Sequence, residues 1–339
     1  MAVDVARPEV SPPRTGSSRR AALAVVCGLA LIAVVVRVAD PERIAWLQNF
    51  LIVFGSLLVE ATPFILLGAF VSAAIEVFVP TSTFAHLARL PRPLQLPAAA
   101  LAGIAFPVCE CGSVPVARRL ASKGLAPSAA ITFMLAAPIL NPVVVASTFV
   151  AYRGRDSLWV MVLGRMALGF LVAVAVGWVI GATRKEDILK ARPGDDDVDV
   201  EAGPDESRWA RFTSHLSGDF FFMGRFLVMG AAIAAAVQTF VPQTIVTRLA
   251  NLPVLSLLAM MGLAFLMSLC SESDAFVAAS FTSFGPAAQL AFLVSGPMID
   301  LKLAALYAGT YSKGFVRTVI VTVVAVTLVG TLWIQVVFG

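Results

Sequence analysis

Charged residues are scarce in this sequence. Asp, Glu, Lys and Arg together make up 14% of its 339 residues, whereas soluble domains carry about a quarter. Hydrophobic residues reach 59%, and the mean hydropathy is +0.88. This composition excludes an ordinary soluble globular protein, so we expect an integral membrane protein.

Histidine is also rare, which limits the metal sites that the chain can form. Both histidines, His86 and His215, fall in polar connections, and this excludes an imidazole-based metal site inside the membrane. The cysteines all lie in apolar sequence, so a disulfide framework is not expected. They are either buried free thiols or ligands of a soft centre. The four are Cys27, Cys109, Cys111 and Cys270.

Two further absences narrow the function. The chain has no glycine-rich phosphate loop of the G-x-x-x-x-G-K-[ST] type, which excludes nucleotide hydrolysis by that route. The net charge is +4, but the basic residues are scattered at the ends of apolar stretches and do not form a stripe, so no nucleic-acid partner is expected. We predict no cofactor, assign no metal and leave the oligomeric state open. The expected partners are a small-molecule substrate and the lipid bilayer.

Long apolar stretches dominate what is present. A membrane core of ~30 Å requires about 20 apolar residues in a helix. The stretches of that length are 21–39, 49–79, 125–150, 157–181, 219–241, 286–310 and 316–338. Two more, 97–119 and 254–283, are apolar but interrupted, so each is either a full span or a re-entrant hairpin.

The chain carries a degenerate internal repeat. Phe78-Val79-Pro80 recurs as Phe240-Val241-Pro242, and Cys109-Glu110-Cys111 falls near Cys270-Ser271-Glu272. A hydrophobic chain built twice from one unit, with polar groups at matching interruptions, is typical of a transporter whose site lies between the repeats.

This repeat divides the sequence into five parts. We expect a disordered cytoplasmic tail (1–20), an N-terminal signal-anchor helix and loop (21–46), a first membrane repeat (47–182), a charged cytoplasmic linker (183–218) and a second membrane repeat (219–339). The predicted fold is an all-α polytopic membrane protein. It has two inverted repeats, each of three spans plus a re-entrant or broken helix, preceded by one extra N-terminal helix.

The distribution of Lys and Arg predicts the topology. With a cytoplasmic N-terminus and re-entrant 97–119 and 254–283, most basic residues lie in cytoplasmic loops; if both segments cross fully, that bias disappears. The positive-inside rule therefore favours the re-entrant arrangement. Each repeat then crosses the membrane an odd number of times, so the two copies are inverted.

The first candidate site is the Cys109-Glu110-Cys111-Gly112 motif. Side chains two residues apart diverge on a helix but project to the same side of extended backbone. Pro107, Gly112 and Pro115 bracket the motif and favour unwinding, so we expect both thiols in non-helical backbone. Cys270 should approach them from the second repeat. The alternative is that these thiols pack as small hydrophobic groups; we interpret Cys27, outside the repeat, in this way.

Carboxylates in apolar sequence form the second candidate group: Glu60, Glu76, Glu110, Glu272, Asp274 and Asp300. A charged residue at bilayer depth costs at least ~2.5 kcal/mol, which favours a functional role. We predict proton or ion coupling for Glu110, Glu272 and Asp274. The alternative is an internal ion pair with Arg165 or Lys302, and Glu76 is expected at the interface.

Asn141 and Asp300 are the third candidates. They end the matching segments Pro138–Asn141 and Pro297–Asp300, where prolines free backbone carbonyls within a span. We predict that both face a midplane cavity and contact substrate together with the three repeat cysteines. The alternative is a proline kink satisfied by neighbouring Ser or Thr.

These motifs carry a family resemblance. The run from Pro107 to Leu120, followed by Lys123–Val145, resembles the predicted-permease family that contains the ArsP-type organoarsenical efflux permeases. The resemblance covers about 49–338 and implies a polytopic bacterial inner-membrane permease. For the ArsP branch it also implies export of trivalent organoarsenicals such as methylarsenite, with Cys109 and Cys111 as soft ligands.

Three functions remain at this point. The first is alternating-access efflux of a thiophilic small solute, which the thiols without imidazoles favour. The second is transport of a divalent metal or a sulfur-containing anion by carboxylates or helix ends. The third is a membrane thiol–disulfide redox protein. In the first two the chain is a transporter and no enzyme.

Overall fold

The computed structural model describes residues 45–80, 90–106, 108–181, 188, 190, 207–240 and 253–338. It divides into two compact units, 1–49 and 50–339, and the first contributes only residues 45–49 to the described ranges. The expected tail and signal-anchor helix, including Cys27, therefore lie outside the described residues, as do His86 and most of the linker.

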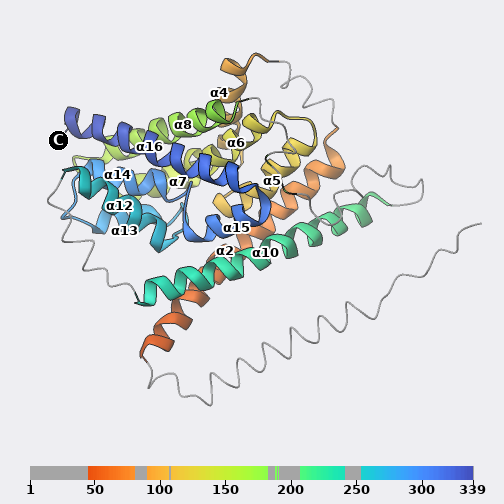
Figure 1. Cartoon of the computed structure of the whole chain (residues 1–339), viewed down its shortest axis with the longest axis horizontal. Coiled ribbons are helices and arrows are strands. Elements are labelled where there is room, and N and C mark those ends of the chain that lie inside the picture. Colours follow the sequence, from red (N-terminus) through yellow and green to blue (C-terminus); the bar gives the residue numbers. More distant parts are fainter. Residues whose placement is uncertain are drawn as a thin grey trace, which may run out of the picture. The chain divides into compact units, whose positions relative to one another are not determined.

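The regular elements in these ranges are helices (Figure 1). They are α2 (Ala45–Phe78), α4 (Arg92–Ala102), a 3₁₀ turn η2 (Gly103–Ala105), α5 (Glu110–Ser122), α6 (Pro127–Leu140), α7 (Pro142–Ala151), α8 (Leu158–Ile180), α10 (Arg208–Phe240), α12 (Pro253–Met267), α13 (Asp274–Ser280), α14 (Pro286–Ser295), α15 (Leu301–Thr310) and α16 (Lys313–Phe338).

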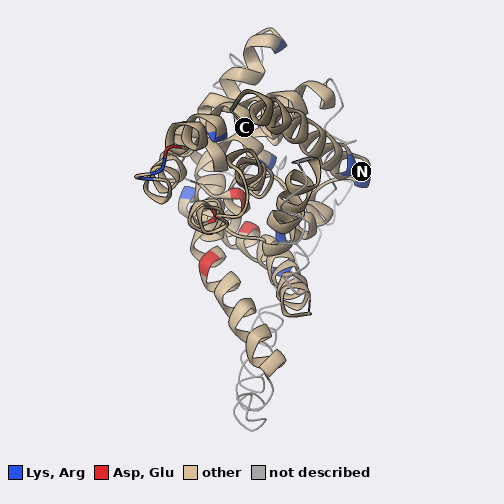
Figure 2. Ribbon diagram, turned by 90° about the vertical axis from the view of Figure 1, so that its left-hand side faces the viewer, with Lys and Arg blue, Asp and Glu red and all other residues tan. Residues whose placement is uncertain are grey.

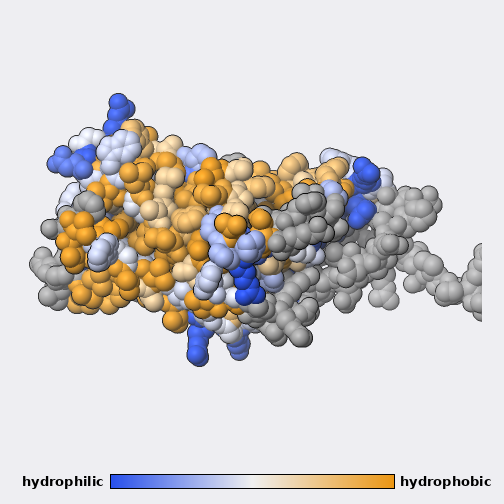
Figure 3. All heavy atoms as spheres, turned by 90° about the horizontal axis from the view of Figure 1, so that it is seen from above, coloured by the Kyte–Doolittle hydropathy of each residue, from blue (hydrophilic) through white to orange (hydrophobic). Residues whose placement is uncertain are grey.

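Five of these segments are long and apolar enough to cross a membrane: Ala45–Phe78, Pro127–Ala151, Leu158–Ile180, Arg208–Phe240 and Lys313–Val337. Val254–Met267 and Pro286–Ser295 are shorter apolar helices. Large apolar side chains also cover the outer surface, and Figure 3 shows a broad hydrophobic face with hydrophilic residues mainly at its borders. The protein is an all-α polytopic membrane protein, as the composition predicts.

The order of elements repeats along the chain. A long helix, an interrupted segment, a broken span and a second long helix occur as α2, α4–α5, α6–α7 and α8, and again as α10, α12–α13, α14–α15 and α16. The two series pack against each other through α8, which contacts α16 and α14, and through their short helices, where α5 packs against α15 and α13 against α7. The inverted relation between the series stays a prediction.

The apolar stretches 125–150 and 286–310 are broken at the proline-marked segments that the repeat alignment pairs. α6 ends at Leu140 and α14 ends at Ser295. Asn141 has φ −54° and ψ 130°, because a residue before a proline is disfavoured in the helical region. Asp300 is likewise extended, with φ −146° and ψ 177°. Both breaks are local and were encoded in the sequence.

One linker boundary is also different. Residues 208–218, assigned to the linker from their charge, form the start of α10. Phe212 is buried there, and its ring packs against Phe70 of α2 at 5.2 Å between centroids. This apolar contact favours helix over a solvated connection. It also places His215 in a helix and not in a polar loop.

A close backbone approach holds the start of α5 against α2. A Cβ added at Gly68 would clash with the backbone of Gly112, and one added at Gly112 would lie 2.9 Å from the carbonyl oxygen of Phe64. Gly112 was expected to help unwind the thiol motif. Instead it lies within α5, where its missing side chain allows two helix backbones to touch.

This contact leads to a stability prediction. Gly68→Ala should destabilise the protein by about 1–3 kcal/mol, because the added methyl group is forced into backbone that cannot move aside. Thermal unfolding in detergent measures the effect. Gly55→Ala is the matched control on the same helix, since a Cβ there meets no atom within 4 Å. Equal stability of the two variants would contradict the close-approach interpretation.

Candidate functional site

The two interrupted segments meet through Glu110. This residue is in the first turn of α5, and its Oε2 accepts hydrogen bonds from Ser271 N (3.4 Å) and Ser271 Oγ (3.1 Å) in the break between α12 and α13. Ser271 Oγ also lies 3.3 Å from Glu272 Oε2. The repeat alignment pairs these two breaks, and the structure brings their side chains into contact.

Lys302 supplies the positive charge where the two interrupted segments contact each other. Its Nζ lies 3.4 Å from Glu110 Oε1, 3.8 Å from Asp300 Oδ2 and 4.0 Å from Cys270 Sγ, and the residue is 1% exposed. Gly230 of α10 allows this placement, because a Cβ there would lie 2.9 Å from Lys302 Cα. One buried ammonium group therefore contacts charged and thiol groups from both series of helices.

The thiols lie beside this group. Cys109, Cys111 and Cys270 are free and buried. The expectation that both Cys109 and Cys111 lie in non-helical backbone is wrong for Cys111, which is in α5, whereas Cys109 is the extended N-cap residue. Their thiols nonetheless lie close enough to interact with each other.

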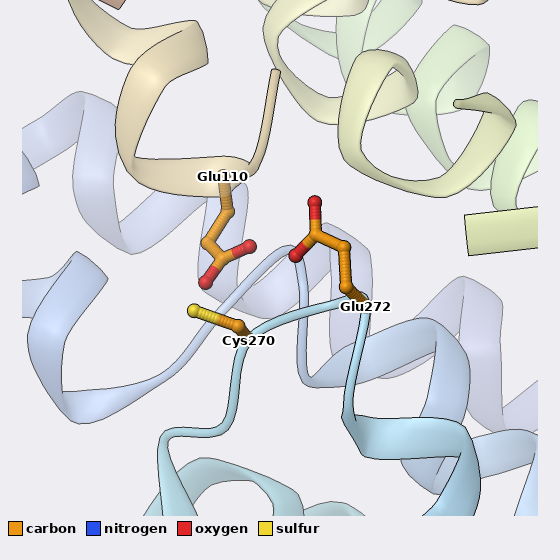
Figure 4. A group of neighbouring side chains, drawn as sticks. All are labelled: Glu110, Cys270 and Glu272. Atoms are coloured by element: carbon orange, nitrogen blue, oxygen red, sulfur yellow. The ribbon is translucent and has the colours of Figure 1, made fainter. Parts of the chain in front are cut away.

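Glu272 completes a group of possible metal ligands. One ligand atom from each of Glu110, Cys270 and Glu272 lies within 4.8 Å of the others, and Figure 4 shows the three side chains pointing toward one another. Glu110 and Cys270 are buried and Glu272 is partly buried. A thiolate with two carboxylates matches the ligand types that bind zinc.

Asp274 is held by Arg165 and not by the Glu110 group. Arg165 Nη2 donates to Asp274 Oδ2 at 2.7 Å and to the Ser271 carbonyl at 3.1 Å, and Nη1 donates to Thr148 Oγ1 at 2.9 Å. This pair joins α8, α7 and the break before α13. Acidic and basic residues thus lie among the helices as well as at their ends, as Figure 2 shows. The internal ion pair is the geometry found for Asp274.

Asn141 and Asp300 both cap helices. Asn141 Oδ1 accepts from Val143 N at 2.8 Å at the start of α7, and Asp300 Oδ1 accepts from Leu303 N at 2.6 Å at the start of α15. Both side chains are buried. Asp300 also belongs to the Lys302 group, whereas a shared cavity with Asn141 stays a prediction.

A second ionic network lies at the other end of α5. Arg119 Nη1 is 3.3 Å from Glu76 Oε2, and its Nη2 is 3.4 Å from Asp219 Oδ2. Ser72 Oγ donates to Asp219 Oδ2 at 2.7 Å, and Lys123 Nζ is 3.7 Å from Glu76 Oε1. These ion pairs and the hydrogen bond connect α2, α5 and α10. Glu76, expected at the interface, is buried and paired.

The sequence interpretation underestimated the cations. It named Arg165 and Lys302 as ion-pair partners only, and both pairings with acids are present. It did not assign them to the site, and it did not consider Ser271 or Thr148. The rule that marked the acids applies equally to a buried Lys or Arg in apolar sequence, so that signal was available for Lys302. Nothing comparable in the sequence marked the hydroxyl groups of Ser271 and Thr148 as members of the site.

Comparisons with known proteins agree with this architecture. Residues 46–336 match the family model described as "Predicted permease". The chain is 38% identical over 284 residues to UPF0718 protein YcgR of Bacillus subtilis (strain 168), covering 84% of this chain and 96% of that protein. It is 35% identical over 270 residues to a putative two-component membrane permease complex subunit of Streptococcus mutans serotype c, covering 78% and 88%. No solved structure matches.

Proposed function

The chain belongs to the predicted-permease family, and we propose that this membrane permease exports a trivalent organoarsenical such as methylarsenite by alternating access. The observation that carries the proposal is that Cys109 and Cys111 are both buried at the start of α5, close enough for their thiols to interact. Two adjacent thiols without imidazole ligands suit a soft, thiophilic centre.

The stoichiometry of ligand exchange supports this substrate. Methylarsenite carries one methyl group and two hydroxyl groups on arsenic. Each of two thiols forms one As–S bond and gives its proton to a departing hydroxyl group, so two water molecules leave and no electrons are transferred. The adduct has two protein ligands and remains exchangeable, which suits release on the other side of the membrane.

Uptake into everted membrane vesicles tests the substrate and the direction. The panel is methylarsenite, antimonite, zinc and thiosulfate, each compared with vesicles that lack the protein. We expect energised accumulation of methylarsenite, because the cytoplasmic face of an everted vesicle is outside and export appears as uptake. Accumulation of only zinc or only thiosulfate would refute the proposal and favour the carboxylate or helix-end alternative.

The topology of the permease is part of the proposal. We infer a cytoplasmic N-terminus and a re-entrant α4–α5 segment, supported by the excess of Lys and Arg in the loops that this arrangement places inside. Arg92 and Arg155 are exposed and lie on opposite sides in this topology.

Labelling with a membrane-impermeant thiol reagent tests it. Arg155→Cys should react in intact cells, and Arg92→Cys should react only after the cytoplasmic face is opened. The parent chain controls for background from its own cysteines, three of which are buried. Failure of Arg155→Cys to react in intact cells, while Arg92→Cys also reacts only from the cytoplasmic face, would overturn the re-entrant topology and the inversion that follows from it.

A further inference from the structure

We propose that Glu110, Cys270 and Glu272 form a binding site for a soft divalent cation, Zn²⁺ or Cd²⁺, and that Lys302 leaves this site when the cation binds. The site goes beyond the arsenical function and does not include the Cys109–Cys111 pair. Its three ligand atoms come from the two interrupted segments and already lie within 4.8 Å of one another (Figure 4).

The donor set selects the class of ion. Mg²⁺ and Ca²⁺ bind six or more oxygen ligands, whereas one thiolate with two carboxylates suits Zn²⁺ or Cd²⁺. Bonds of about 2.3 Å to sulfur and about 2.0–2.2 Å to oxygen require the ligand atoms to close by roughly 1 Å. Cys270 and Glu272 lie in the non-helical residues between α12 and α13, where such a shift does not break a helix. A fourth position stays open to water, so the ion remains exchangeable.

Lys302 shows that the position attracts a cation. Its ammonium group lies 3.4 Å from Glu110 Oε1 and 4.0 Å from Cys270 Sγ. A divalent ion bound to Glu110 Oε1 and Cys270 Sγ would lie next to the Lys302 ammonium group, and the two cations would repel each other. Binding therefore requires Lys302 to move.

Asp300 provides the place to which Lys302 moves. Its Oδ2 is fully buried, has no hydrogen-bond partner and lies 3.8 Å from Lys302 Nζ. Buried carboxylate oxygens normally have such a partner. A shift of the ammonium group toward Asp300 gives this oxygen a hydrogen bond and clears Glu110 and Cys270 for the ion. This oxygen without a hydrogen bond is thus the second observation, independent of the ligand group, that points to this exchange.

Cadmium binding to the purified full-length protein in detergent tests the site. Equilibrium dialysis gives the affinity, and the ultraviolet charge-transfer absorption of a cadmium–thiolate bond reports on the cysteine. In a Cys109→Ser, Cys111→Ser background, which removes the neighbouring pair of soft ligands, we expect this absorption to persist and an added Cys270→Ser to abolish it. Glu110→Gln and Glu272→Gln should each weaken binding at least about 10-fold. Loss of the absorption in the Cys109→Ser, Cys111→Ser background, or its retention after Cys270→Ser is added, would overturn the proposal.

The role of Lys302 predicts a change of opposite sign. Lys302→Met should tighten Cd²⁺ binding at least about fivefold, the factor for a single pair of like unit charges at ~4 Å in water, which the double charge of Cd²⁺ exceeds. Lys302→Arg keeps the charge and should not tighten binding. Weaker binding by a folded Lys302→Met variant would refute the exchange.

Asp300→Asn tests the same step if Lys302→Met does not fold. Asparagine still caps α15, but it leaves Lys302 without a carboxylate to move toward, so Cd²⁺ binding should weaken. Unchanged or tighter binding would refute the exchange. None of these measurements requires transport, so their outcome is independent of the vesicle experiment with methylarsenite.

Discussion

Cells that depend on a Cys109→Ser, Cys111→Ser double variant should lose all protection against methylarsenite, with growth inhibited at the concentration that inhibits cells without the protein. Serine is close to cysteine in size but is a poor ligand for a soft centre, so the loss reports thiolate chemistry and not packing. Each single variant should lose protection too, because one thiol alone leaves a hydroxyl group on arsenic in place of the second As–S bond. Growth curves over a methylarsenite series measure the effect.

Two controls accompany this measurement. Cys27→Ser should behave like the parent, since that residue lies outside the duplicated unit. Immunoblots of membrane fractions and size-exclusion profiles in detergent show whether the variants insert and fold, which matters because both thiols are buried. Full resistance in a well-folded double variant would eliminate the thiolate mechanism and favour transport through carboxylates.

Arg165→Met should destabilise the protein by about 3–5 kcal/mol, the cost of leaving one partner of a buried ion pair without the other. Asp274 is 3% exposed, and Arg165 is its salt-bridge partner at 2.7 Å. The substitution also removes the donors to Thr148 Oγ1 and to the Ser271 carbonyl, next to Glu110. We therefore expect transport to be lost together with stability. Thermal and denaturant unfolding in detergent measure the change.

Two further variants isolate the ion pair. Arg155→Met is the control, because Arg155 is exposed in the turn between α7 and α8, over the ring of Tyr152 at 5.6 Å. It should change stability by less than about 0.5 kcal/mol. Adding Asp274→Leu to Arg165→Met removes the uncompensated charge and should recover much of the lost stability. A cost below about 1 kcal/mol for Arg165→Met alone would show that the pair is not desolvated as the structure indicates.

Much of the fold was predictable because membrane burial imposes a strong pattern. The positions of the interrupted segments followed from residues that do not continue an apolar helix, such as the polar run Ser271–Asp274. The breaks after α6 and α14 were predicted from the prolines of the two matching segments. What the sequence did not show is that the Asn141 and Asp300 side chains cap new helices there. Each cap accepts a hydrogen bond from a backbone N–H group that the break leaves without a helical partner.

The candidate site was predictable only in part. Repeat alignment identified Glu110, Cys270 and Glu272 as members of equivalent breaks, and these three side chains do converge. The backbone expected around Cys111 was wrong, because Gly112 and Pro115 lie within α5, which begins at Glu110 and leaves only Cys109 of the pair extended. The two thiols nonetheless lie close enough to interact.

The sequence by itself determined that the protein lies in a bilayer, because its hydropathy is high and its charges are few, and it showed which thiols and carboxylates lie in apolar sequence. The sequence did not determine which carboxylate pairs with each buried Lys or Arg. Asp300 is two residues from Lys302, but Glu110 reaches the same ammonium group from α5, and Arg165 goes to Asp274. Only the tertiary structure decided these pairings, because they depend on how closely α10 and α15 approach at Gly230 and on how α5 packs against α15. An ion pair in a low-dielectric interior forms between the charges that packing brings within a few ångströms, whatever their separation along the chain.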